Sequence, residues 1–322
     1  IDLTAPSVIE NTPKDYITKQ TACQPEKGDP ELWLKFLDVI FDGDRKVINF
    51  IQRLCGYALT GEANQEKLFF LYGSGANGKS VFIETLTHIW KDYATRIAPK
   101  TLLKTTNDRH NTEIAKLAGA RLVLGSELPI GEVWDDQKLK ELTGGDTITA
   151  NFMRQDFFDF KPQFTLILAG NHIPRMKYVG EAERRRFVLI PFEVTISEHK
   201  RDPMLGDKLK AEASQILTWC IKGAAMYLQS GLKIPQSIIK TSQDYLDSED
   251  AIGEFIKSQL VSVSGKRTEI NRLTQAANDW FSANMHNKVL DPKSLRRELR
   301  DRGKTVKRSN DTYYLLDHDL VA

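Results

Sequence analysis

The sequence predicts an α/β fold with a parallel β-sheet core, a helical N-terminal region and a small C-terminal domain. Three observations support this prediction. Short, nearly continuous apolar runs recur between residues 66 and 192, and such strands suit a parallel sheet that is covered on both faces. Helical patterns lie between these runs, which favours right-handed βαβ crossovers. Beyond residue 235, helical patterns continue and end in one apolar β run.

The predicted elements divide the chain into three regions, 1–62, 63–235 and 236–322. The first is mostly helical, because apolar residues recur at helical spacing in two stretches. The second holds four candidate strands and a long amphipathic helix from about 205 to 229, and a proline-bearing stretch follows it. The candidate strands cover residues 67–72, 121–125, 164–169 and 187–192.

The third region combines helices with a terminal strand, which suggests a winged-helix-like domain. Its predicted elements are helices at 251–259, 270–283 and 294–302 and a strand at 312–316. Between residues 288 and 308 nine lysines and arginines face three acidic residues. Helical spacing puts part of this charge on one face, so we expect DNA contacts there. The expected DNA-binding residues are Arg296, Arg297 and Arg300. A solvated basic face is the alternative.

Composition sets broad limits on the protein class. The 322 residues are 41% hydrophobic and 27% charged, which is ordinary for a globular protein of two or three domains. No apolar run is long enough to span a bilayer, and no signal peptide opens the chain. Three widely separated cysteines argue against a disulfide framework or a zinc site and fit a reducing cytoplasm. Because the chain begins with Ile1, we expect it to be a fragment.

The strongest motif is a complete phosphate loop, G-x-x-x-x-G-K-S, which follows one apolar run and precedes a helical pattern. Glycines let the backbone wrap around a phosphate chain, and the helix N-terminus adds a positive dipole. Lys79 is expected to reach the β- and γ-phosphates of ATP, and the Ser80 hydroxyl is expected to bind Mg²⁺. The expected nucleotide-binding residues are Gly73, Ser74, Gly75, Ala76, Asn77, Gly78, Lys79 and Ser80.

Two polar residues that end later apolar runs complete the predicted catalytic site. Glu127 follows the run at 121–125, and Asn171 follows the run at 164–169. Open parallel sheets bind ligands beyond the carboxyl ends of their strands, so both side chains are expected near the phosphates. Glu127 would orient and deprotonate the attacking water, and Asn171 would contact the γ-phosphate or that water. A solvated loop glutamate and a turn-forming asparagine are the alternatives.

Three consecutive arginines, 184–186, precede the last apolar run. In ring-shaped ATPases an arginine reaches the γ-phosphate of the neighbouring subunit and stabilises charge in the transition state. Arg185 and Arg186 are the candidates for this arginine finger. A solvated basic turn or a structural ion pair is the alternative.

The order of these motifs resembles superfamily 3 helicases, in particular the poxvirus and phage primase-helicases, which are related to AAA+ ATPases. Segments at 56–61 (Gly-Tyr-Ala-Leu-Thr-Gly), 119–123 and 142–146 (Leu-Thr-Gly-Gly-Asp) share this resemblance. It implies an AAA+-like core, an N-terminal oligomerisation collar and a homo-hexamer that translocates 3′ to 5′ on single-stranded DNA. A primase domain upstream and replication in a bacterial host or at a viral replication site are also implied.

The resemblance also implies a hairpin at 147–162 that projects into a central channel and grips DNA. Relatives often carry basic residues where this chain has Asn151 and Gln155, so fewer cations remain. The candidate DNA contacts in this part are Lys138, Lys140 and Arg154. Phe152, Phe157 and Phe158 are expected to be core residues rather than platforms for bases.

The sequence departs from the family pattern in one place. Many members have two adjacent carboxylates where this chain has Ser126 and Glu127, so the metal would be held largely by Ser80, phosphates and water. His110, in a polar loop, is assigned no role. The competing function is a nucleotide-dependent assembly or switch ATPase without unwinding activity. A phosphate-loop kinase is disfavoured, because no acceptor-substrate pocket is evident in the sequence.

Overall fold

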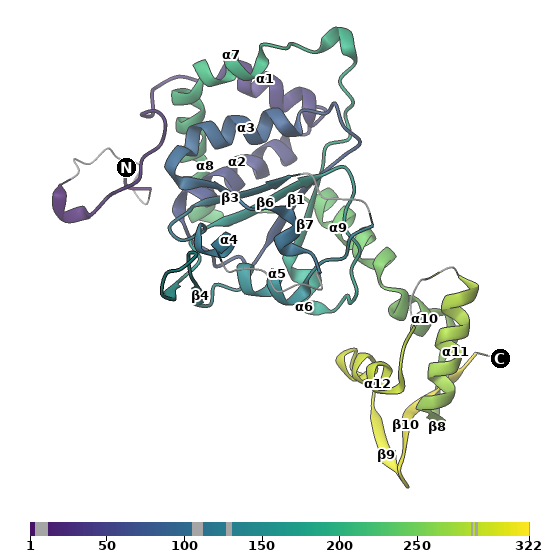
Figure 1. Cartoon of the computed structure of the whole chain (residues 1–322). Helices are drawn as coiled ribbons and strands as arrows, with labels where there is room; N and C mark the ends of the chain where they lie inside the picture. Colours follow the sequence, from purple (N-terminus) through teal and green to yellow (C-terminus); the bar gives the residue numbers. More distant parts are fainter. Residues whose placement is uncertain (4–11, 105–111, 127–130, 285, 287–288, 322) are drawn as a thin grey trace. The chain divides into compact units, whose positions relative to one another are not determined.

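The computed structural model describes residues 1–3, 12–104, 112–126, 131–284, 286 and 289–321 (Figure 1). The chain forms two compact units. Unit 1 consists of Ile1–Arg175 and Arg185–Ser242, and unit 2 consists of Met176–Arg184 and Gln243–Ala322. The three-region division made from the sequence stays a prediction, because compactness alone does not define functional domains.

A five-stranded parallel sheet forms the centre of unit 1. Its strand order is β2-β3-β6-β1-β7, so strands distant in sequence lie side by side. The expected α/β fold with a parallel sheet is confirmed, and four strands match predicted runs. Only the short edge strand β2 was not predicted, because three residues with two polar side chains give no strand pattern. The strands are β1 (Leu68–Tyr72), β2 (Ala94–Arg96), β3 (Leu122–Ser126), β6 (Thr165–Gly170) and β7 (Phe187–Pro191).

Five helices cover one face of this sheet (Figure 1). They share one hydrophobic core with the strands, in which Trp33, Phe69 and Phe82 are fully or almost fully buried. Apolar residues on one face of each helix produce this packing. The helices are α1 (Glu31–Ile40), α2 (Arg45–Thr60), α3 (Lys79–Trp90), α7 (Leu205–Ala211) and α8 (Ala213–Ser230).

The predicted single helix at 205–229 is wrong, since α7 and α8 are separate helices that meet at Glu212. The helical pattern is interrupted at Glu212, whose side chain caps another helix. The Glu212 carboxylate accepts hydrogen bonds of 3.0 Å from the backbone N–H groups of Leu32 and Trp33, at the start of α1. These N–H groups have no partner within their own helix, so Glu212 satisfies both at once.

The other face of the sheet in unit 1 is covered by short elements and an antiparallel hairpin (Figure 1). The hairpin strands are β4 (Ile148–Ala150) and β5 (Phe158–Phe160), which confirms the predicted hairpin. The helices on this face are α4 (Thr112–Ala115) and α5 (Asp136–Thr143). Helix α6 (Glu181–Arg186) contains a boundary between the two units, which lies between Arg184 and Arg185. Elsewhere unit 1 has the 3-10 turns η1 (Pro13–Asp15), η2 (Lys91–Tyr93), η3 (Pro99–Leu102) and η4 (Glu198–Lys200).

Unit 2 has its own core and an antiparallel sheet of order β8-β10-β9. Asn310 and Asp311 join β9 to β10 with positive φ angles of 46° and 62°, as a tight hairpin turn requires. The sequence predicted one strand here and missed two, because β8 is largely exposed and lacks a buried alternation. The elements are α10 (Ala251–Gln259), β8 (Leu260–Glu269), α11 (Ile270–Ala283), α12 (Pro292–Asp301), β9 (Val306–Ser309) and β10 (Thr312–Leu320).

Helix α9 (Gln236–Glu249) contains the point at which unit 1 ends and the C-terminal part of unit 2 begins. Across all residues that the structure describes, every helix is too short or too polar to cross a membrane.

Candidate nucleotide-binding site

The glycine-rich loop at 73–80 lies between β1 and α3, at the carboxyl edge of the parallel sheet. A Cβ at Gly73 would lie 2.2 Å from the carbonyl oxygen of Phe192, so only glycine fits there. Three further loop residues adopt left-handed backbone conformations, and such turns direct N–H groups into a concave anion-binding surface. Their φ angles are 102° at Gly75, 50° at Ala76 and 86° at Gly78.

Lys79 is buried within this loop, with 7% of its surface exposed. Its Nζ donates hydrogen bonds to the carbonyl oxygen of Gly73 at 2.7 Å and to Oδ1 of Asn77 at 3.1 Å. Both acceptors are neutral, and burial lowers the pKa of the Lys79 ammonium group. Asn77 is held in turn, because its Nδ2 donates to the carbonyl oxygen of Phe192 at 2.9 Å. A buried cation among neutral acceptors fits an anionic phosphate group.

The loop forms one wall of a pocket of about 740 Å³, which is within the usual range for nucleotide-sized ligands. Asn171 also lines this pocket, together with Lys79 and Ser80. The sheet explains why Asn171 and the loop lie together, because β6 pairs with β1 so that Gly170 lies beside Tyr72. The structure therefore brings Asn171 into the same pocket as the phosphate loop.

The opposite wall of the pocket was missed by sequence reasoning. It comes from α1 and from the segment after β7, which contributes both apolar and charged side chains. Helix α1 approaches the loop closely, since a Cβ at Gly78 would lie 2.7 Å from Cγ2 of Ile40. The additional lining residues are Leu32, Lys35, Phe36, Val39, Val194, Thr195, Ile196, Ser197, Lys200, Arg201, Asp202 and Leu205.

The proposed catalytic glutamate cannot be placed, since Glu127 lies outside the described residues, as does His110. The strand before Glu127 is described. Strand β3 ends at Ser126, which pairs with Ala169 of β6, so both strands end at the edge that holds the loop. Among the described residues no group of three or more His, Cys, Asp and Glu side chains could hold a metal ion.

The three arginines have different surroundings. Arg184 forms ion pairs with Asp247 at 2.6 Å and with Asp250 at 3.2 Å, all within unit 2. Arg185 and Arg186 share Glu66 in unit 1, at Nη2–Oε2 distances of 2.7 and 3.1 Å.

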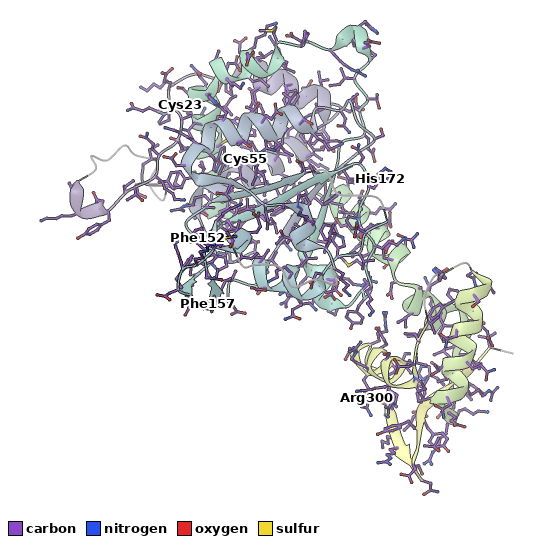
Figure 2. All side chains as sticks on the ribbon, in the orientation of Figure 1. Cys23, Cys55, Phe152, Phe157, His172 and Arg300 are labelled. Atoms are coloured by element: carbon purple, nitrogen blue, oxygen red, sulfur yellow. The ribbon has the colours of Figure 1, made fainter. Side chains whose placement is uncertain are left out.

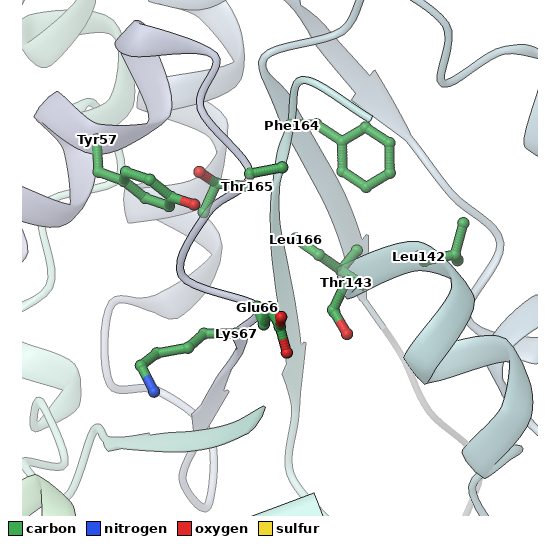
Figure 3. A pocket seen from close by; sticks show the side chains of 9 residues that line it. Tyr57, Glu66, Lys67, Leu142, Thr143, Phe164, Thr165 and Leu166 are labelled. Carbon is green, nitrogen blue, oxygen red and sulfur yellow. The ribbon is translucent and has the colours of Figure 1, made fainter. Parts of the chain in front are cut away.

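The last two arginines differ in exposure. The Arg185 side chain is 61% exposed, whereas the Arg186 side chain is only 10% exposed. The Nε of Arg186 also donates to Oγ1 of Thr143 at 3.2 Å. Glu66 and Thr143 line a small cavity beside the starts of β1 and β6 (Figure 3). This cavity, of about 10 Å³, has room for one water molecule but not for a ligand.

The hairpin residues are placed differently from the prediction. Phe152 and Phe157 were expected in the core, but they are 37% and 68% exposed (Figure 2). They belong to the loop beyond the last strand pair, Ala150 and Phe158. Phe158 is half-buried and stacks on Phe152 with ring centroids 5.8 Å apart, so the prediction is wrong for two of three phenylalanines.

The candidate DNA contacts of unit 1 are accessible to different degrees. Arg154 is exposed in the hairpin loop, with a φ of 61°. Lys138 forms an ion pair with Glu141 at 2.6 Å on α5, and Lys140 is half-buried on the same helix. Arg154 is therefore the most accessible of the three.

In unit 2, helix α12 has one apolar face and one basic face. Leu295 and Leu299 are buried, whereas Arg297 and Arg300 are exposed. The guanidinium carbon of Arg296 lies 3.7 Å from the ring centroid of Tyr313, so this arginine is held by a cation–π contact.

Comparisons with known proteins give relatives without a described function and relatives with a named one. Residues 71–186 match the model of a "Family of unknown function (DUF5906)", which covers less than half of the chain. "Putative helicase L207/L206" of Acanthamoeba polyphaga mimivirus is 27% identical over 302 residues, 86% of this chain and 31% of that protein. "Putative helicase V13" of Sputnik virophage is 24% identical over 260 residues, 78% of this chain and 32% of that protein. The chain thus spans about a third of these relatives.

Solved structures share the fold. The apo structure of the "NrS-1 C terminal region" matches with a TM-score of 0.55 at 14% identity, over 91% of this chain and 76% of that one. At this identity the match shows the fold alone. The named relatives support a relationship to helicase-like proteins of viruses.

Proposed function

We propose that this chain is the ATP-driven motor of a replicative DNA helicase that translocates on single-stranded DNA. The observation that carries the proposal is the pocket in which a glycine-rich loop, the buried Lys79 and Asn171 meet. Viral relatives carry helicase names, so DNA unwinding is the work that we expect of such a motor. Superfamily 3 membership, an AAA+-like core and 3′ to 5′ polarity follow from the motif order and belong to the same proposal.

The pocket residues have separate roles in this proposal. Lys79 binds the β- and γ-phosphates of ATP, and Ser80 contributes its hydroxyl to Mg²⁺, which would screen the phosphate charge. Glu127 orients the attacking water and accepts its proton. Asn171 binds the γ-phosphate or this water. The base and ribose would occupy the part of the pocket lined by α1 and the segment after β7, which offers both apolar and charged side chains.

The sheet supports action of Arg185 on a neighbouring subunit. In the parallel register Phe187 pairs with Leu68, so Arg185 precedes the amino edge of the sheet. The phosphate loop follows the other end of the five-residue strand β1, which is about 16 Å long at ~3.3 Å per residue. Arg185 therefore lies at the end of the sheet opposite the phosphate loop of its own subunit. We accordingly propose a homo-hexamer in which it serves as the finger for the next subunit.

Unit 2 fits a winged-helix role in DNA binding. Its order of helix, strand, two helices and a two-stranded hairpin suits such a domain, and α12 would contact phosphates through Arg296, Arg297 and Arg300. In unit 1, Lys138, Lys140 and Arg154 are the proposed contacts with the translocating strand. A primase domain upstream in the full protein completes the proposal.

The test is ATP hydrolysis by the purified chain with and without single-stranded DNA. We expect magnesium-dependent hydrolysis that rises several-fold with DNA, is abolished by Lys79→Ala, and is slowed far more than ATP binding by Glu127→Gln. Hydrolysis that single-stranded DNA leaves unchanged would instead favour an assembly or switch ATPase.

A further inference from the structure

The geometry points to Glu66 as the residue that positions the arginine finger for the neighbouring nucleotide. This inference rests on the proposed role of Arg185 between subunits and adds a residue to it. Glu66 lies in the bend that leads into β1 and belongs to no recognised motif in the chain.

One carboxylate oxygen of Glu66 binds both arginines. Oε2 accepts hydrogen bonds from Nη2 of Arg185 at 2.7 Å and from Nη2 of Arg186 at 3.1 Å. Arg186 is fixed further by Oγ1 of Thr143, which itself donates to the carbonyl oxygen of Leu139 at 2.6 Å. Arg186 and Glu66 are thus held in place by their neighbours, and Arg185 is the outer, mostly exposed member of the group.

The backbone of Arg185 is tied to the same segment before β1. Nζ of Lys67 donates to the carbonyl oxygen of Arg185 at 2.8 Å. Glu66 itself adopts a φ of 50°, a left-handed conformation that is uncommon for a residue with a side chain. Figure 3 shows Glu66 and Lys67 side by side, with Thr143 across the cavity from Glu66. The side chain and main chain of Arg185 are both held from residues 66 and 67.

Fold stability accounts for the contact of Glu66 with the largely buried Arg186, but not for its contact with Arg185. The Arg185–Glu66 pair is exposed, and exposed ion pairs contribute little to the free energy of unfolding. Unusual backbone conformations tend to occur where function requires them. Glu66, Lys67, Arg185 and Arg186 carry three positive charges and one negative charge, so the group keeps an excess of +2. When Arg185 turns to a phosphate, Arg186 stays with Glu66, and the carboxylate keeps a partner.

The test uses mixed rings in which each subunit has one defect. A Lys79→Ala subunit lacks nucleotide binding but donates an intact Arg185. An Arg185→Ala subunit binds ATP but donates no finger. In mixtures, hydrolysis should recover only at interfaces where the phosphate loop of an Arg185→Ala subunit meets Arg185 of a Lys79→Ala subunit. Glu66→Gln, which keeps the size of the side chain and removes its charge, is then placed in one partner or the other.

We expect Glu66→Gln in the arginine-donating subunit to lower the recovered kcat about tenfold, a part of what a finger contributes, with the KM for ATP unchanged. The same change in the nucleotide-binding subunit should leave recovery unaltered, which also shows that the variant folds and assembles. Glu181→Gln, an exposed carboxylate on α6, is the matched control in the donating subunit and should have no effect.

Three outcomes would each overturn one of two separate claims. Equal recovery with and without Glu66→Gln in the donating subunit contradicts the positioning role, while the finger itself stands. An equal loss from either subunit also contradicts it, since that is what a general structural defect produces. Absence of any recovery in rings that co-assemble, before Glu66 is changed, refutes the intersubunit finger on which the inference rests.

Discussion

Replacing Lys79 by methionine should abolish nucleotide binding with little change in the free energy of unfolding. The methionine side chain is similar in length and apolar, so it fits the buried site. It removes two hydrogen bonds from a charged donor, worth about 1.5–3 kcal/mol each, and also removes a charge whose burial opposes folding. These effects offset one another. We therefore expect the free energy of unfolding without nucleotide to change by only about 1 kcal/mol.

Nucleotide should stabilise the parent but not this variant. A ligand at one hundred times its Kd stabilises the folded state by about 2.7 kcal/mol, which for a chain of this size raises Tm by about 5 °C. The assay is thermal unfolding at matched concentrations of a non-hydrolysable ATP analogue and Mg²⁺. Lys79→Met should show a shift below about 1 °C. An equal shift in both proteins would mean that the nucleotide binds elsewhere.

Three further predictions follow from packing and charge. A Cβ at Gly223 would lie 2.0 Å from the Gln52 carbonyl oxygen, so Gly223→Ala should lower the free energy of unfolding in urea by about 3 kcal/mol, whereas Gly206→Ala, with open space, should not. Burial raises the pKa of Asp250, but Arg302 and the N–H of Gly253 outweigh it and lower the pKa overall. The ionised Asp250 therefore stabilises unit 2 above about pH 4, and this stabilisation is lost as pH falls. Asp250→Asn should lower the free energy of unfolding by about 2 kcal/mol and remove this pH dependence, as measured by denaturation monitored by Trp280 fluorescence. Arg297→Gln with Arg300→Gln should flatten the dependence of log affinity for single-stranded DNA on log salt by about 1.4, whereas Lys257→Gln should not; an unchanged slope would exclude these contacts.

The sequence predicted much of the fold because its signals are local. Buried parallel strands appear as apolar runs, and the phosphate loop has a fixed spacing between strand and helix. Asn171 could be proposed because residues after neighbouring parallel strands share one edge of the sheet. The structure brings Asn171 into the pocket with Lys79, as that reasoning expected.

Features that depend on tertiary contacts could not be predicted. Glu212 interrupts a helical pattern because it caps α1, a partner 180 residues away. Glu66 gives no signal in the sequence, since its two arginines follow about 120 residues later. Apolar character alone also misplaced Phe152 and Phe157, because these side chains lie in the hairpin loop beyond the last strand pair and are exposed.

The central claim is that ATP hydrolysis by this chain drives movement along one DNA strand. The most direct measurement is strand displacement from duplexes with a single-stranded tail on either the 3′ or the 5′ side, with ATP and Mg²⁺ present. We expect displacement with the 3′ tail, none with a blunt duplex, and none from Lys79→Ala protein. Hydrolysis of ATP without displacement from any of these duplexes, under conditions in which the rings are assembled, would contradict the claim.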